Sequence, residues 1–98
     1  MGNHKAALPL YTRALEIREA VLGPRHPDTA ISLNNLAALH QAMSNHKAAL
    51  PLLTRALEIR EAVLGPRHPE TAGSLSNLAA LHKDMSNHKA ALPLLYHC

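Results

Sequence analysis

The chain repeats itself with a fixed period of 42 residues. Residues 3–44 and 45–86 differ at six of these 42 positions, and a third copy runs from Asn87 to Leu95. Self-similarity at a fixed period is typical of repeat architectures, in which each unit packs only on its neighbours. The period therefore decides the fold class before secondary structure is considered.

Each period contains two amphipathic helical patterns joined by the link Gly-Pro-Arg-His-Pro. Gly65 and Pro66 predict the end of the first pattern, and Pro69 suits the first turn of the second. We predict five helices and no strands, at about residues 4–22, 28–43, 46–64, 70–85 and from about 88 onward. The expected fold is all-α, a right-handed α-solenoid of helical hairpins, since neither helix of a hairpin can bury its apolar stripe alone.

We expect residues 1–98 to form one array. It consists of a partial repeat (1–23), a hairpin (27–64) and a second hairpin (69–98) whose last helix is truncated. Both ends fall inside a repeat and carry no polar cap, which predicts either a segment of a longer array or self-association through the ends. For the same reason Leu8, Leu15 and Leu22 should be less covered than Leu50, Leu57 and Leu64.

Composition excludes several kinds of partner. The formal net charge is +3, but Arg and Lys are interleaved with Glu and only two residues are aromatic. We therefore expect no nucleic-acid partner. No apolar run approaches the roughly 18 residues of a membrane helix, so we expect no membrane association. The single cysteine, Cys98, fits a reducing compartment, and we expect the protein to be cytoplasmic.

Two motifs indicate a family. The chain reads Leu33-x-x-Leu36-Ala37-x-x-His40, then Ala49-x-x-x-Leu53, and residues 75–95 repeat this pattern. The spacing resembles that of tetratricopeptide repeats, although the period exceeds their usual length of about 34 residues. The longer form is similar to the repeats of kinesin light chains, with the resemblance carried by residues 7–40. The chain departs from that pattern at residues 44–46, where the family usually has Gly-x-Tyr, and at His40, where it commonly has Tyr.

The six differences between the copies mark one helical face. Residues 31, 34, 41 and 42 of the first helix of the hairpin are four of them, and these four fall within about 100° on a helical wheel, opposite Leu33, Leu36, Ala37 and His40. We interpret the edited stripe as a recognition face. The resemblance agrees, because first helices of tetratricopeptide arrays line a concave groove that holds a partner peptide. Carried over by position, the groove residues are Ile31, Asn34, Asn35, Ala38, Gln41, Ala42, Gly73, Ser76, Asn77, Ala80, Lys83 and Asp84.

The sequence offers no catalytic or cofactor motif. We interpret its eight histidines as local hydrogen-bonding residues, two of them at tyrosine positions of the repeat, and not as metal ligands. We expect no enzyme activity, no cofactor and no metal. Two function classes remain: a scaffold that binds a protein or peptide in the groove, or a structural module that assembles without a peptide ligand.

Overall fold

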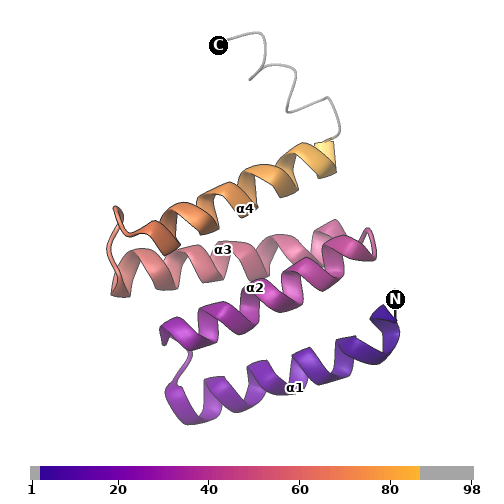
Figure 1. The fold of residues 1–98 in the computed structure, drawn as a ribbon, viewed down its shortest axis with the longest axis horizontal. Coiled ribbons are helices and arrows are strands. Elements are labelled where there is room, and N and C mark those ends of the chain that lie inside the picture. Colours follow the sequence, from indigo (N-terminus) through magenta and orange to yellow (C-terminus); the bar gives the residue numbers. More distant parts are fainter. Residues whose placement is uncertain (1–2, 87–98) are drawn as a thin grey trace, which may run out of the picture.

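The computed structural model describes residues 3–86 and folds them into four α-helices. These are α1 (His4–Leu22), α2 (Pro27–Ala42), α3 (His46–Val63) and α4 (Pro69–Ser86). The helices zigzag in chain order, each running back along its predecessor, from α1 at one end of the stack to α4 at the other (Figure 1). The all-α class is confirmed, and these four helices match the predicted ranges within one residue at each end. The predicted fifth helix lies outside the described residues, and the right-handed turn of the array stays a prediction.

Small residues let the helices approach closely. The helix α2 contacts both α1 and α3, and its buried residues include Thr29, Ala30, Ser32 and Ala37 beside three leucines. The core divides into two clusters, one centred on each half of the α2–α3 contact. The first cluster consists of Leu15, Ala30, Leu33, Leu36, Ala56 and Ile59, and the second of Ala37, Ala49, Leu53 and Leu81.

The expectation that three leucines of α1 lose cover is wrong for one of them. Leu22 is exposed while Leu64 is half-buried, as expected, and Leu8 and Leu50 are both half-buried. Leu15 is buried, however, whereas its counterpart Leu57 is only half-buried. Leu15 is buried because it lies on the side of α1 that packs against α2, where it belongs to the first core cluster.

Two glycines make the sharp turns from α1 to α2 and from α3 to α4. Gly23 has φ +99° and Gly65 has φ +102°, in the region that residues with a Cβ rarely adopt. Each glycine carbonyl accepts a hydrogen bond from a threonine in the first turns of the next helix: Thr29 Oγ1 donates to Gly23 at 2.8 Å, and Thr71 Oγ1 donates to Gly65 at 2.7 Å. The turn and the start of the following helix are thus fastened together.

Histidines begin the helices that follow these turns. The Nδ1 atom of His26 accepts the backbone N–H of Asp28 at 3.0 Å, and His68 accepts that of Glu70 at the same distance. Either histidine precedes a proline at the first helical position, where the missing N–H costs nothing. A ring nitrogen therefore does the work that Ser, Thr, Asp or Asn usually does at a helix start.

A buried arginine joins three helices. Arg60 of α3 donates from Nη1 to Ser74 Oγ at 3.0 Å and to the Glu70 carbonyl at 3.2 Å, both in α4. With its amide oxygen turned toward the guanidinium, Asn34 of α2 accepts from Nη1 at 2.9 Å. Arg18 of α1 makes the matching contacts to α2, at 2.8 Å to Ser32 Oγ and 3.4 Å to the Asp28 carbonyl.

We predict opposite effects for alanine at two glycines. Gly23→Ala should lower the free energy of unfolding by about 1–3 kcal/mol, because φ is positive there. Gly73→Ala should raise it by about 0.5–1 kcal/mol, because Gly73 lies inside α4 and a Cβ there meets nothing within 4 Å. Urea unfolding followed by circular dichroism measures both. Equal destabilisation by the two changes would show that the positive φ of Gly23 does not distinguish it from Gly73.

We also predict unequal losses for the two arginines. Arg60→Ala should cost about 1.5–3 kcal/mol of stability, since it removes charged hydrogen bonds from the buried Ser74 hydroxyl and the Glu70 carbonyl. Arg18→Ala should cost less, because Arg18 is only half-buried and has no contact matching that of Asn34. Urea unfolding compares the two variants. A larger loss of stability for Arg18→Ala would show that the contact of Arg60 with Asn34 of α2 does not contribute to stability.

Candidate functional site

The edited stripe lies on the open side of α2 and α4. Ten of its twelve residues are exposed and do not belong to the core clusters. We call these ten the groove face: Ile31, Asn35, Ala38 and Ala42 from α2, and Gly73, Ser76, Asn77, Ala80, Lys83 and Asp84 from α4. Opposite them, Leu33, Leu36 and Ala37 are buried, as the helical wheel predicts.

The other two residues of the stripe are half-buried at its edge. Asn34 faces the guanidinium of Arg60, and Gln41 lies about two helical turns farther along the same side of α2. Asn34 therefore serves the scaffold through its amide oxygen. Its counterpart in α4, Ser76, is exposed. A helical wheel could not separate these roles, because it places residue 34 only about 40° from the exposed residue 38.

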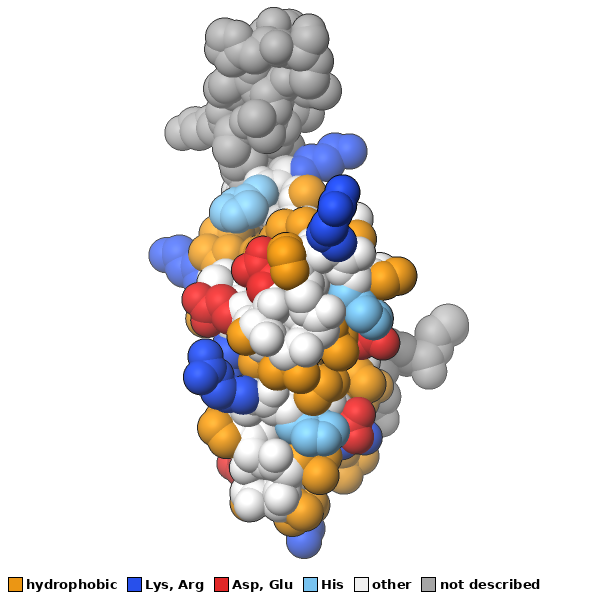
Figure 2. All heavy atoms as spheres, turned by 90° about the vertical axis from the view of Figure 1, so that its left-hand side faces the viewer, with side chains coloured by type: hydrophobic (Ala, Val, Ile, Leu, Met, Phe, Trp, Pro, Cys, Tyr) orange, Lys and Arg blue, Asp and Glu red, His pale blue; other side chains and the backbone are white. Residues whose placement is uncertain are grey.

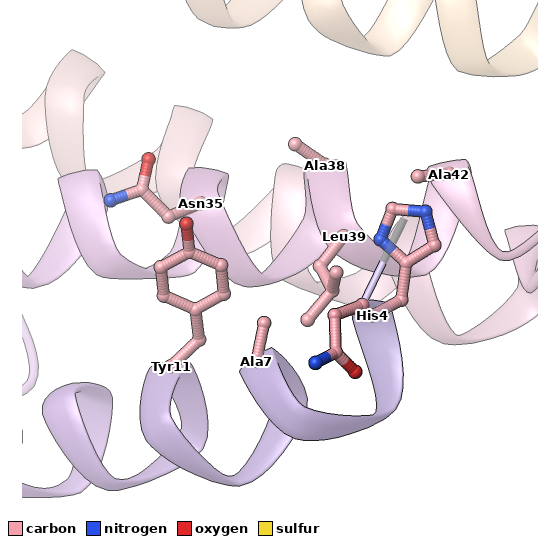
Figure 3. Close-up of a pocket in the computed structure, with 8 residues that line it drawn as sticks. His4, Ala7, Tyr11, Asn35, Ala38, Leu39 and Ala42 are labelled. Carbon is pink, nitrogen blue, oxygen red and sulfur yellow. The ribbon is translucent and has the colours of Figure 1, made fainter. Parts of the chain in front are cut away.

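A hollow of about 390 Å³ lies between α1 and the groove face (Figure 3). Its lining consists of Asn3, His4, Ala7 and Tyr11 from the first helix and its start, and Asn35, Ala38, Leu39 and Ala42 from α2. Figure 3 shows the Tyr11 ring reaching from α1 toward Asn35. The structure thus brings three predicted residues, Asn35, Ala38 and Ala42, together with an aromatic side chain.

The α1 side of this hollow was not foreseen from the sequence. One signal was available, because Tyr11 replaces Leu53 and is one of the six differences between copies. Between α3 and α4 the counterparts of three lining residues are buried: Leu53 and Ala49 pack there with Leu81 and with Ala37 of α2. A second hollow, of about 350 Å³, is lined by Ser44, Asn45, His46, Lys47 and Met85, none of which belongs to the groove face.

A sequence model described as tetratricopeptide repeat matches residues 1–62 and again 32–98. The chain belongs to the tetratricopeptide repeat family. Domains of this family are generally protein–protein interaction modules, and they are typically non-catalytic. A search of curated proteins found no match to the chain.

Three histidines of these tetratricopeptide repeats make local contacts. His26 and His68 begin helices, and the His40 ring nitrogen lies 3.5 Å from the Asn45 side-chain amide. Asn45, expected from the sequence to cap α3, makes no side-chain cap hydrogen bond. Within residues 3–86, no group of three His, Cys, Asp or Glu side chains could share a metal ion.

Charges are dispersed over the described part of the repeat. Figure 2 faces the side on which the α1–α2 and α3–α4 links lie, and there basic and acidic side chains are interspersed with apolar ones. Arg55 of α3 pairs with Glu19 of α1 across the stack, and its Nη2 lies 3.5 Å from the Pro24 carbonyl. None of α1 to α4 has the length and hydropathy needed to span a bilayer.

We predict that neighbouring residues of α2 respond differently to truncation. Leu36→Ala should lower the free energy of unfolding by about 2–5 kcal/mol, because the side chain is buried in the first core cluster. Asn35→Ala should change it by less than about 0.5 kcal/mol, because Asn35 is exposed on the groove face. Thermal and urea unfolding measure both, and a comparable loss for the two variants would invert the face assignment.

Proposed function

We propose that the chain is an interaction scaffold that holds a peptide segment of a partner protein along the groove face. The partner lies across α2 and α4 and contacts both helices. As part of this proposal we assign the repeats to the 42-residue kind found in kinesin light chains and place the protein in the cytoplasm. The long second helix of the hairpin, α3 with 18 residues, supports the subtype.

One observation carries the proposal: most of the differences between the copies lie on the groove side of α2 and α4. Four of the six differences lie on the stripe, and its α4 members are all exposed. Other exposed positions are unchanged between the copies, such as Glu16 and Glu58. If exposure alone allowed change, these charged residues should have varied too.

The groove face has chemistry that suits a peptide backbone. Asn35 and Asn77 occupy the same position of successive repeats, and both are exposed. A carboxamide donates and accepts at once, which matches the C=O and N–H of a peptide unit. Ala38 and Ala80 beside them have small side chains, which leaves room for a backbone to approach.

The edited residues give the two helices different side-chain chemistry. On α2 the stripe has uncharged residues, including Ile31 and Ala42, whereas on α4 it has Lys83 and Asp84. A partner would therefore meet an apolar, amide-lined part on α2 and a charged part on α4. Such a difference fixes the direction in which a peptide lies, because charges contribute more to specificity and orientation than to affinity.

The proposal is tested by selecting peptides from a random library on the immobilised chain. For a selected peptide, Asn35→Ala and Asn77→Ala should each raise the dissociation constant roughly two- to tenfold, the effect of one lost hydrogen bond of about 0.5–1.5 kcal/mol. Isothermal titration calorimetry measures this, and unfolding curves should be unchanged. The matched control is Glu58→Ala, an exposed change on α3.

Two outcomes would contradict peptide binding at the groove face. One is a selected peptide whose affinity the double variant Asn35→Ala, Asn77→Ala leaves unchanged. The other is a peptide that loses affinity with Glu58→Ala and not with the asparagine variants. Either result would place binding on another surface of the stack.

A further inference from the structure

The helix α1 exposes an apolar face that its own copy, α3, keeps buried. Ile17 is 52% exposed and its counterpart Ile59 4%, while Tyr11 is 41% exposed and its counterpart Leu53 1%. The sequences of the two helices are nearly the same, so the difference comes from their neighbours. The helix α3 covers this face with α2, and α1 has no helix in the corresponding place among the described residues.

The helix α4 shows the opposite half of the same contact. Leu75 is 49% exposed, whereas its counterpart Leu33 in α2 is 0% exposed. Ala72 and Ala79 are exposed too, and their α2 counterparts are fully buried against α3. The exposed face of α4 therefore corresponds to the face of α2 that packs on α3. Among the described residues, no helix covers this face of α4 as α3 covers that of α2.

We propose that a second copy of this chain docks its α4 on α1 of the first, in the register in which α2 packs on α3. We call the two surfaces the α1 end face (Ala7, Leu10, Tyr11, Ala14 and Ile17) and the α4 end face (Ala72, Leu75, Leu78 and Ala79). The α2–α3 contacts give the register when 42 is added to each α2 residue number and subtracted from each α3 residue number. Leu75 then lies against Ala14 and Ile17, and Ala79 lies against Ala7 and Tyr11.

The hollow of Figure 3 supports this register. Ala7, Tyr11 and Leu39 line it, and their counterparts Ala49, Leu53 and Leu81 are buried with Ala37 in the second core cluster. What the hollow lacks is therefore a counterpart of Ala37. Ala79 of the second copy is that counterpart, on a helix that is exposed at this position.

Polar groups also match across the proposed contact. Arg60 of α3 reaches Asn34 of α2, in addition to its bonds to α4. Arg18 of α1 makes the equivalent bonds to α2 only. In the docked pair, Ser76 of the second copy occupies the place of Asn34 and presents a hydroxyl to Arg18.

The residues that follow α4 are the competing occupant of its end face. Residues 87–95 repeat the start of α1 and α3, and Leu95 corresponds to Leu53. The 98 residues contain no third counterpart of Ile59, which packs with Leu33 in the first core cluster. A second copy supplies a counterpart of Ile59, as Ile17, for the end face near Leu75.

The contact joins two different surfaces, so it is head-to-tail and does not close on itself. Association should grow with concentration and lengthen the stack. In such a stack α4 of one copy is followed by α1 and α2 of the next, and the groove face continues from copy to copy. The end faces adjoin the groove face, from which Ser76 takes part in the contact. Association of the chain with itself can be measured without a peptide, so the inference is tested separately from the groove.

Sedimentation equilibrium under reducing conditions tests the inference on the 98-residue chain. The weight-average mass should rise above that of a monomer with increasing concentration. Ile17→Glu and Leu75→Glu should each weaken association at least about tenfold, because either puts a charge into an apolar contact. Both side chains are half exposed in the described structure, and circular dichroism checks that the variants stay folded.

A mixture of the two variants distinguishes head-to-tail docking from other modes. Ile17→Glu leaves the α4 end face intact and Leu75→Glu leaves the α1 end face intact, so the mixture should form a one-to-one heterodimer. Val63→Glu is the matched control: Val63 is 50% exposed, and its counterpart Val21 is exposed as well, so it lies outside the interface. The control should associate like the unmodified chain.

Three results would overturn the inference. The unmodified chain could remain a monomer even at about millimolar concentration. Either glutamate variant alone could associate like the unmodified chain. Finally, Leu95→Asp could abolish association, which would show that residues 87–98 make the contact. Unchanged or stronger association of Leu95→Asp supports docking of α4 on α1.

Discussion

The buried guanidinium of Arg60 contacts both helices that carry the groove face. With the amide oxygen of Asn34 turned toward it, this guanidinium joins Asn34 of α2 and Ser74 of α4 to α3. An arginine suits this position because its planar fork donates to several acceptors in fixed directions. The Thr71–Gly65 bond and the His68 cap fix the start of α4 beside it.

The core explains why the ends of the stack are open. It consists mainly of alanine, leucine and small hydroxyl residues, which allow close helix approach but bury little surface on any one helix. Each helix therefore relies on both neighbours, as in other solenoids. The pairs Ile17 and Ile59, and Leu75 and Leu33, show how the same side chain is buried inside the array and exposed at its ends.

The sequence predicted what depends on period and local propensity. The four described helices, the turns at Gly23 and Gly65, and the packed face with Leu36 all follow from the 42-residue repeat and the helical wheel. It did not predict what depends on the neighbouring helix. A wheel gives the direction of a side chain and not what it meets, so the contact of Asn34 with Arg60 and the burial of Leu15 against α2 were missed. The caps at His26 and His68 were missed because histidine is not a common residue at that position.

The six differences between copies bear on both surfaces. Ile31/Gly73 and Ala42/Asp84 change the groove face alone, whereas Leu53 and Asn34 pack against a neighbouring helix and their counterparts Tyr11 and Ser76 are exposed. Inside the chain these last two places hold Leu53, which is buried, and Asn34, which meets Arg60. At the proposed contact between copies they hold Tyr11 and Ser76, the two members that keep a hydroxyl. A contact that forms and dissociates must leave its parts tolerable in water, and the phenol of Tyr11 is better solvated than the side chain of Leu53. The editing is thus consistent with a permanent interface within the chain and a reversible one between chains, built on the same helix register.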